Sequence, residues 1–201
     1  LILTFLTVLV KWKYQNTVTG FMQTRTILLW STNRQLYHAN QGGITMKIIM
    51  GADPAGFELK NAIKEDLLKR GYDVTDIDPD TPVLFQDAAK AVARGVQSKE
   101  YERGIAICGT GMGVSIICNK HRGVYAALCE SIYQARRAKV VNNTNVLCMG
   151  GFIIGNEMGR EMARAWLEAE HMVGLDPEMA AIVEKEFDEL VDFEAEMYGD
   201  K

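Results

Sequence analysis

Apolar residues in this chain alternate between short continuous runs and longer stretches with helical spacing, a pattern typical of α/β proteins. The short runs predict strands at 47–52, 72–77, 103–108, 124–129 and 145–150. The stretches between them predict helices at 56–70, 83–98, 113–119, 131–141 and 155–170. The strands are continuously apolar, as burial on both faces requires. We therefore expect an α/β fold, a three-layer αβα sandwich with a five-stranded parallel sheet.

A further helix is expected after this α/β body, because apolar residues recur at helical spacing from Met179 to Leu190 with no strand behind them. Asp176-Pro177-Glu178 is a plausible helix start. Residues 176–201 hold ten acidic and two basic residues. This acidic C-terminal amphipathic helix is expected to pack on its own domain or on a second subunit.

The first 45 residues differ in kind from the rest, with four basic residues and no acidic ones. The opening LILTFLTVLV is too short to span a bilayer and lacks the features of a signal peptide. Gln41-Gly42-Gly43 can be encoded by a ribosome-binding sequence shortly before Met46. We interpret 1–45 as a non-native leader read in frame, or alternatively as a disordered or weakly membrane-attracted arm. The predicted domain is then 46–175, followed by the helix in 176–201.

Composition narrows the class of protein. The chain is 48% hydrophobic and 24% charged, enough to bury a core, and its net charge of −4 argues against a nucleic-acid binder with a broad basic face. Its four cysteines lie in or beside apolar runs without metal-ligand or redox-motif spacing. We expect free thiols, a cytoplasmic location, and neither a nucleic-acid nor a membrane partner.

Candidate functional residues follow several of the predicted strands. This position is informative because ligands of open parallel sheets bind at the carboxyl ends of the strands. The first strand ends at Asp53, the third at Cys108 and the fourth at Glu130-Ser131. We expect these three ends to line one rim.

The loop Cys108-Gly-Thr-Gly-Met-Gly113 is the most informative of these ends. Its glycines let the backbone present consecutive N–H groups to an anion, and the same field favours a thiolate at Cys108. A thiolate beside such a cradle suits proton abstraction next to a carbonyl. Two alternatives stay open: Cys108 is simply the last buried strand residue, or the loop binds a dinucleotide with Glu130 as the acidic partner, although GTGMG lacks the usual glycine spacing.

The segments MGADPAGFELK, AICGTGMGVSIICNK and NNTNVLCMGG strongly resemble the ribose-5-phosphate isomerase B and galactose-6-phosphate isomerase family, collinearly from Met46 to about Glu170. The resemblance implies a Rossmann-like sheet, a homodimer or homotetramer, and active sites at the subunit interface. It also implies aldose–ketose isomerisation of a sugar phosphate through an enediol, with no metal and no cofactor. Some relatives pair unlike chains, so such a pairing is a further possibility.

Site residues follow from the resemblance position by position. Cys108 falls on the catalytic base, and Val114 stands where another branch has a glutamate base. Thr110 falls in the loop that holds the enediolate oxygens. Asn119 and Asn142 match amides that either contact substrate or hold a loop, and Asn142 has a further interpretation as a helix cap. The residues expected to bind substrate are Asp53, Gly109, Gly111, Met112, Gly113, Asn119 and Asn142.

The chain also departs from the family pattern. Pro54 and Val141 replace two histidines, one of them linked to ring opening, and Phe152 replaces an arginine. The C-terminal segment that reaches phosphate is absent. Loss of the ring-opening histidine fits an open-chain substrate such as a tetrose phosphate. Loss of the arginines fits a non-phosphorylated sugar, or cations relocated to Arg136, Arg137 and Lys139. The alternative role of these three residues is a solvated helix face.

Overall fold

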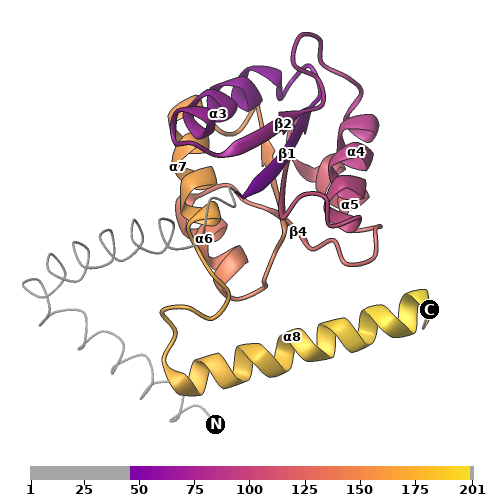
Figure 1. Ribbon diagram of the computed structural model, residues 1–201, viewed down its shortest axis with the longest axis vertical. Helices are drawn as coiled ribbons and strands as arrows, with labels where there is room; N and C mark the ends of the chain where they lie inside the picture. Colours follow the sequence, from indigo (N-terminus) through magenta and orange to yellow (C-terminus); the bar gives the residue numbers. More distant parts are fainter. Residues whose placement is uncertain (1–45, 200–201) are drawn as a thin grey trace, which may run out of the picture. The chain divides into compact units, whose positions relative to one another are not determined.

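The computed structural model describes residues 46–199, in which a parallel sheet lies between two layers of helices (Figure 1). Its strands are β1 Lys47–Ala52, β2 Asp73–Asp76, β3 Arg103–Cys108, β4 Ala126–Leu128 and β5 Val146–Gly150. Its helices are α3 Phe57–Lys69, α4 Phe85–Gln97, α5 Met112–Cys118, α6 Ile132–Val140, α7 Asn156–Leu167 and α8 Pro177–Tyr198. The predicted α/β class and the alternation of elements are confirmed. The leader hypothesis for 1–45 concerns residues outside this range.

The five strands run in the order β2-β1-β3-β5-β4, and every pairing is parallel. From β1 the chain moves outward to β2, then returns to β3 and continues to the other side. The strand order therefore reverses between β1 and β3, where Ala52 is in register with Ile107. Loops that follow two such strands diverge, which makes this point the usual ligand crevice of an open α/β sheet.

The core has two layers because successive side chains of a strand point to opposite faces of the sheet. Ile105 and Ile107 of β3 join the cluster under α3, α6 and α7. Ala106 and Cys108 join the cluster under α4 and α5. All six residues of β3 are buried, so the central strand is fixed from both sides.

The two edge strands differ from the prediction of continuous two-sided burial. Residues of β2 alternate between exposed and half-buried, and β4 is only half-buried along its length. Strand β2 pairs only with β1, and β4 pairs only with β5. Strand β4 is also shorter than the predicted 124–129, since only Ala126–Leu128 pair with β5.

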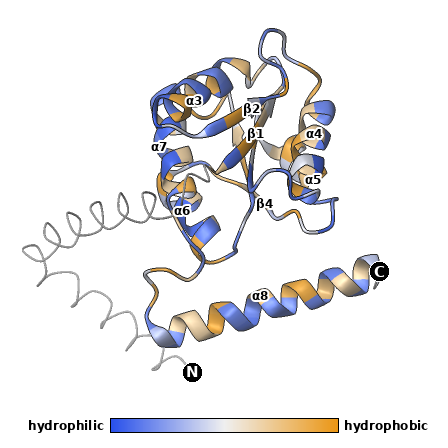
Figure 2. Cartoon of the chain, viewed as in Figure 1, coloured by the Kyte–Doolittle hydropathy of each residue, from blue (hydrophilic) through white to orange (hydrophobic). Residues whose placement is uncertain are grey.

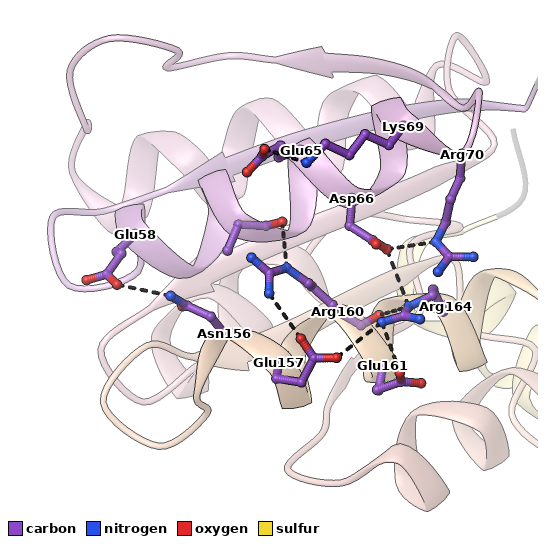
Figure 3. Close-up of polar contacts among 11 residues, drawn as sticks. Glu58, Glu65, Asp66, Lys69, Arg70, Asn156, Glu157, Arg160, Glu161 and Arg164 are labelled. Atoms are coloured by element: carbon purple, nitrogen blue, oxygen red, sulfur yellow. Dashed lines mark hydrogen bonds and ion pairs between the residues drawn. The ribbon is translucent and has the colours of Figure 1, made fainter.

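Helices α3 and α7 are joined by polar contacts along their outer surface (Figure 3). Asp66 of α3 accepts from Arg70 at 2.9 Å and pairs with Arg164 of α7 at 3.3 Å. Asn156, at the start of α7, donates to Glu58 at 3.0 Å. Exposed ion pairs contribute at most about 1 kcal/mol each, so these contacts orient two helices that the core already holds.

Helix α8 begins where the sequence predicted a helix start, with the Asp176 side chain accepting from the Met179 N–H at 3.0 Å. Of its residues only Val183 is buried, and apolar positions remain exposed along it (Figure 2). Glu194 accepts from the Gly123 N–H and the Tyr125 hydroxyl, and Phe187 packs edge-on against Tyr125. No helix within residues 46–199 is long and apolar enough to cross a membrane.

Candidate active site

Cys108 occupies the last position of β3, opposite Gly150 of β5, and is 5% exposed. Its side chain lies in the cluster under α4 and α5. The GTGMG loop begins directly after it and leads into α5 at Met112. The thiol therefore stands at the carboxyl edge of the central strand, beside the point where the strand order reverses.

Three loops meet around Cys108 through backbone hydrogen bonds. The Asp53 N–H donates to the Ile107 carbonyl at 3.1 Å, and the Gly151 N–H donates to the Cys108 carbonyl at 2.8 Å. The Phe152 N–H donates to the Gly109 carbonyl at 2.9 Å. The loops after β1, β3 and β5 are therefore tied to one another at the edge of the sheet.

Strand β4 ends at the same edge of the sheet as β1 and β3, as predicted, but it is not adjacent to either of them. Strand β5 lies between β3 and β4, so Glu130 and Ser131 are one strand further away. Their groups serve the start of α6 instead: the Ser131 hydroxyl accepts from the Gln134 N–H, and the Glu130 N–H donates to the Gln134 side chain.

Glycine is required at two positions of this region because the backbones of the GTGMG loop and β5 lie very close together. Gly111 has φ +76°, and a Cβ there would lie 2.8 Å from the Met149 carbonyl carbon. A Cβ on Gly150 would lie 2.7 Å from the carbonyl carbon of Thr110. Larger residues would therefore force the GTGMG loop away from β5.

The GTGMG loop leaves hydrogen-bond donors unused. Within residues 46–199 the N–H groups of Gly111, Gly113 and Val114 donate to no backbone or side-chain acceptor. Thr110 is exposed, and its hydroxyl oxygen lies 3.5 Å from the Met112 nitrogen. Such donors are suited to a negatively charged oxygen.

Asp53 lies at the turn between β1 and α3. One carboxylate oxygen accepts from the Gly56 N–H at 3.0 Å, which closes that turn. Asp53 is partly exposed, and its other carboxylate oxygen makes no hydrogen bond within the described part of the chain. That oxygen can accept from a substrate hydroxyl.

A buried charge network supports this turn, and sequence reasoning missed it. Lys60 is fully buried, and its amine donates to Asp76 at 2.7 Å and to the Asp78 carboxylate at 3.0 Å. Asp78 in turn accepts from the N–H of Ala52, the last residue of β1. Burial raises the pKa of Asp78, whereas hydrogen bonds from Lys60 and Lys64 outweigh burial and lower the pKa of Asp76. The available signal was a lysine inside the apolar stripe of α3, together with Asp76 at the end of β2 and Asp78 just after it.

The side chain of Asn119 holds two elements together. Its Oδ1 accepts from the Ala126 N–H at 2.9 Å, and its Nδ2 donates to the carbonyls of Ala126 and Ser115. This links the end of α5 to the start of β4. Of the two roles that the resemblance left open for the asparagines, Asn119 is placed for loop holding.

Three predicted substrate contacts lie away from Cys108 within this chain. Asn142 follows the end of α6, and Arg136 lies 3.8 Å from a Cβ built on Gly174, in the segment after α7. Helices α6 and α7 both begin at the carboxyl edge of the sheet, so their last turns lie at the opposite edge. Arg137 shares that part of α6. A role for these residues in catalysis requires a second subunit.

Exposed apolar side chains surround the carboxyl edge. Phe152, the residue after Gly151, is 76% exposed and its ring covers Gly109, where a built Cβ would lie 2.9 Å from it. Other members of this apolar rim are Met112, Ile116, Tyr133 and Ile153. Large exposed apolar side chains beside a candidate site are a common feature of interaction surfaces.

Comparison with known proteins gives consistent results. The family model described as Ribose/Galactose Isomerase matches residues 48–183. The chain is 48% identical to a 4-deoxy-4-sulfo-D-erythrose isomerase of Clostridium sp., over 61% of this chain and 79% of that protein. It is 40% identical to a D-erythrulose-4-phosphate isomerase of Pectobacterium atrosepticum, over 62% of this chain and 84% of that protein. The crystal structure of ribose-5-phosphate isomerase B from Mycoplasma genitalium with bound ribulose-5-phosphate superimposes with a TM-score of 0.68 at 29% identity, covering 76% of this chain and 99% of that one.

Proposed function

The chain belongs to the ribose/galactose isomerase family and is an aldose–ketose isomerase, and from this premise we propose that its substrate is a four-carbon sugar with a sulfonate at C4. The observation that carries the proposal is the loop after β3, in which Cys108 adjoins backbone N–H groups without an internal acceptor. The identity to a 4-deoxy-4-sulfo-D-erythrose isomerase supports this choice of substrate.

The proposed reaction moves one proton between adjacent carbons. The Cys108 thiolate removes the proton from C2 of the aldose, and the electron pair forms the C1–C2 double bond of an enediolate. The N–H groups of Gly111 and Gly113 hold the charged oxygen, and Thr110 supplies a further hydroxyl. The Cys108 thiol then returns the proton to C1, while the O2 proton passes to O1, which leaves the ketose.

An open-chain substrate agrees with two residues that depart from the family pattern. Pro54 and Val141 stand where the resemblance places histidines, one of them linked to ring opening. A tetrose closes a five-membered ring through O4. A sulfonate at C4 removes that oxygen and a phosphate blocks it, so neither sugar needs a residue that opens a ring.

The terminal anion is proposed to be a sulfonate in preference to a phosphate. A phosphate ester carries a charge of about −1.5 to −2 at pH 7, whereas a sulfonate carries a single charge. Phe152, an apolar side chain, lies over Gly109 next to Cys108. The singly charged sulfonate needs fewer cationic partners than the phosphate, so it is favoured at a rim with apolar side chains.

Assembly into a homodimer is part of this proposal. The apolar rim around the carboxyl edge is suited to a second copy of the chain. A second copy is also what would bring Asn142, Arg136 and Arg137 to a Cys108 site. Size-exclusion chromatography with light scattering should give a dimer or a multiple of it, and a monomer at micromolar concentration would contradict this part.

A substrate panel tests the proposed specificity. We expect kcat/KM to be at least tenfold higher for 4-deoxy-4-sulfo-D-erythrose than for D-erythrulose-4-phosphate. Ribose-5-phosphate, galactose-6-phosphate and unsubstituted D-erythrose should be poorer still. Preferential turnover of five- or six-carbon phosphates would overturn the proposal. Activity that appears only after a second, unlike chain is added would show that this chain is one subunit of a pair.

A further inference from the structure

Three basic side chains gather at the amino edge of the sheet, opposite the candidate active site. Arg103 is the first residue of β3, and its guanidinium carbon lies 5.5 Å from the centre of the Trp166 ring. Lys139 is in the last turn of α6, and His171 follows α7. We call Arg103, Lys139 and His171 the basic cluster. Arg103 and Lys139 are 8% and 5% exposed.

Backbone and side-chain contacts make the surroundings of the basic cluster continuous. The Trp166 indole donates to the Thr144 hydroxyl at 2.9 Å, and the Thr144 N–H donates to the Ala138 carbonyl. The Met172 N–H donates to the Val140 carbonyl, which fixes the segment containing His171 against the end of α6. The three basic residues are therefore held by the sheet and by two helices.

The nitrogen atoms of the basic cluster are largely unsatisfied within residues 46–199. The Arg103 guanidinium makes no hydrogen bond there, and its Nε is completely buried without a partner. The His171 ring makes a hydrogen bond with the Val141 backbone, whereas its Nε2 is buried without a partner. The Lys139 amine donates to the Asn143 side chain at 2.6 Å.

Negative charge near the basic cluster is also insufficient. The nearest carboxylate, Glu170, lies 4.0 Å from Arg103, beyond hydrogen-bond distance, and its side chain is 63% exposed. Glu102 and Glu184 act on the cluster only over longer distances. Residues 1–45 contain no aspartate or glutamate. Two buried cations that share one distant and exposed carboxylate are costly, because the desolvation of the two charges is only partly compensated.

We propose that the basic cluster binds a small oxyanion of the phosphate or sulfate class, held between the Arg103 guanidinium and the Lys139 amine. A planar guanidinium and an ammonium group together match the geometry and charge of such an anion. The bound oxyanion supplies the acceptor that Arg103 Nε lacks within residues 46–199, and it adds negative charge to that of Glu170. Burial and the charge of Arg103 lower the pKa of Lys139 to about 8, so the amine is mostly protonated at pH 7.

Within one subunit, this site is separate from the candidate active site. Arg103 and Cys108 lie at opposite ends of β3, which at the usual strand rise are roughly 17 Å apart. The inference therefore does not depend on the proposed substrate, and either can fail without the other.

Inorganic phosphate is the probe for the test, with the full chain in a phosphate- and sulfate-free buffer at pH 7 and constant ionic strength. Thermal unfolding and isothermal titration calorimetry measure its binding. We expect a saturable rise in Tm for the wild type and for Arg94→Met, a matched change at an exposed position of α4. Arg103→Met should bind phosphate at least tenfold more weakly while keeping the wild-type kcat/KM.

Lys139→Met serves as the second variant, in case Arg103→Met does not fold, and it should weaken phosphate binding in the same way. Phosphate that stabilises Arg103→Met or Lys139→Met as strongly as the wild type would overturn the proposal, because the ion would then bind elsewhere. A wild type that does not respond to millimolar phosphate would overturn it as well.

Discussion

At the scale of single residues, all four cysteines of the chain are buried thiols, but they differ in what adjoins them. Burial raises the pKa of Cys129 to about 11, and a hydrogen bond with Cys118 together with burial raises the pKa of Cys148 well above its usual value. Both thiols stay neutral at pH 7 and serve as core residues. Cys108 alone lies at a strand end that is followed by unused N–H donors.

The buried amine of Lys139 should make stability depend on pH. Its pKa is lowered to about 8 in the folded protein, mainly by burial and then by Arg103, against about 10.4 for an unperturbed lysine. Between these values the unfolded chain binds the proton that the folded chain has released, so the contribution of Lys139 to the unfolding free energy rises with pH. At pH 7 the wild type carries the full cost of the buried charge.

We therefore expect Lys139→Met to be more stable than the wild type at pH 7, by ~1–3 kcal/mol in anion-free buffer. This advantage should shrink as the pH approaches 10. Urea unfolding of both proteins at pH 7 and pH 10 measures it, and the shared titrations of tyrosine and cysteine cancel in the difference. A difference that stays constant over this range would show that Lys139 is not desolvated.

On the scale of single elements, the GTGMG loop depends on Gly111 for its shape. A side chain there meets a positive φ, and its Cβ would lie 2.4 Å from the Leu128 side chain. Gly123 has a similar φ of +74° but open space around it. The two positions therefore separate the cost of the backbone conformation from the cost of close packing.

Gly111→Ala should lower the unfolding free energy by ~3 kcal/mol or more and reduce kcat/KM, because β3 and β5 must separate. Gly123→Ala should cost only ~1–2 kcal/mol and leave activity intact. Chemical denaturation and steady-state kinetics compare the two variants. Equal losses in both would contradict the packing that we describe around the loop.

Helix α8 can be tested through Tyr125, which Glu194 of α8 contacts at 3.1 Å. Burial, and then the hydrogen bond and charge of Glu194, raise the pKa of Tyr125 to about 12. In Glu194→Gln we expect this pKa to fall while staying above 10, since burial persists. Ultraviolet titration at alkaline pH, with Tyr125→Phe to assign the signal, makes the measurement. A pKa that Glu194→Gln leaves unchanged would mean that α8 does not dock at Tyr125.

At the scale of the whole molecule, the local sequence pattern was sufficient to predict the strands and helices, but not to predict which strands are adjacent in the sheet. Strand β3 spans 103–108 as predicted, because a continuous apolar run is a local property of the sequence. Whether a strand lies at the edge of the sheet depends on the order of all the strands. Strands β2 and β4 are edge strands because the order is β2-β1-β3-β5-β4. The strand order was not predicted, and so the partial exposure of the two edge strands was missed, although the aspartates of β2 were a local signal of it.

The same limit applies to the site. The ends of β1 and β3 were expected to meet, and the Asp53 N–H does reach the Ile107 carbonyl. The contribution of Gly151 and Phe152 depends on β5 being inserted next to β3, which the sequence pattern alone does not reveal. The unpaired Nε of Arg103 could not be predicted from the sequence either, since it results from packing among β3, α6 and α7.

In the mechanism that we propose, the Cys108 thiol transfers a proton between C1 and C2 of a four-carbon sulfonated sugar. Nuclear magnetic resonance of 4-deoxy-4-sulfo-D-erythrose with the enzyme in deuterium oxide follows isomerisation and solvent deuterium incorporation together. Cys108→Ala should slow both by a hundredfold or more without loss of folding, in line with the ~10²–10⁴-fold contribution of a general base. Cys118→Ser, a matched change at a buried thiol on the same face of the sheet, should retain both activities. Isomerisation and deuterium incorporation at the wild-type rate in Cys108→Ala would contradict the account.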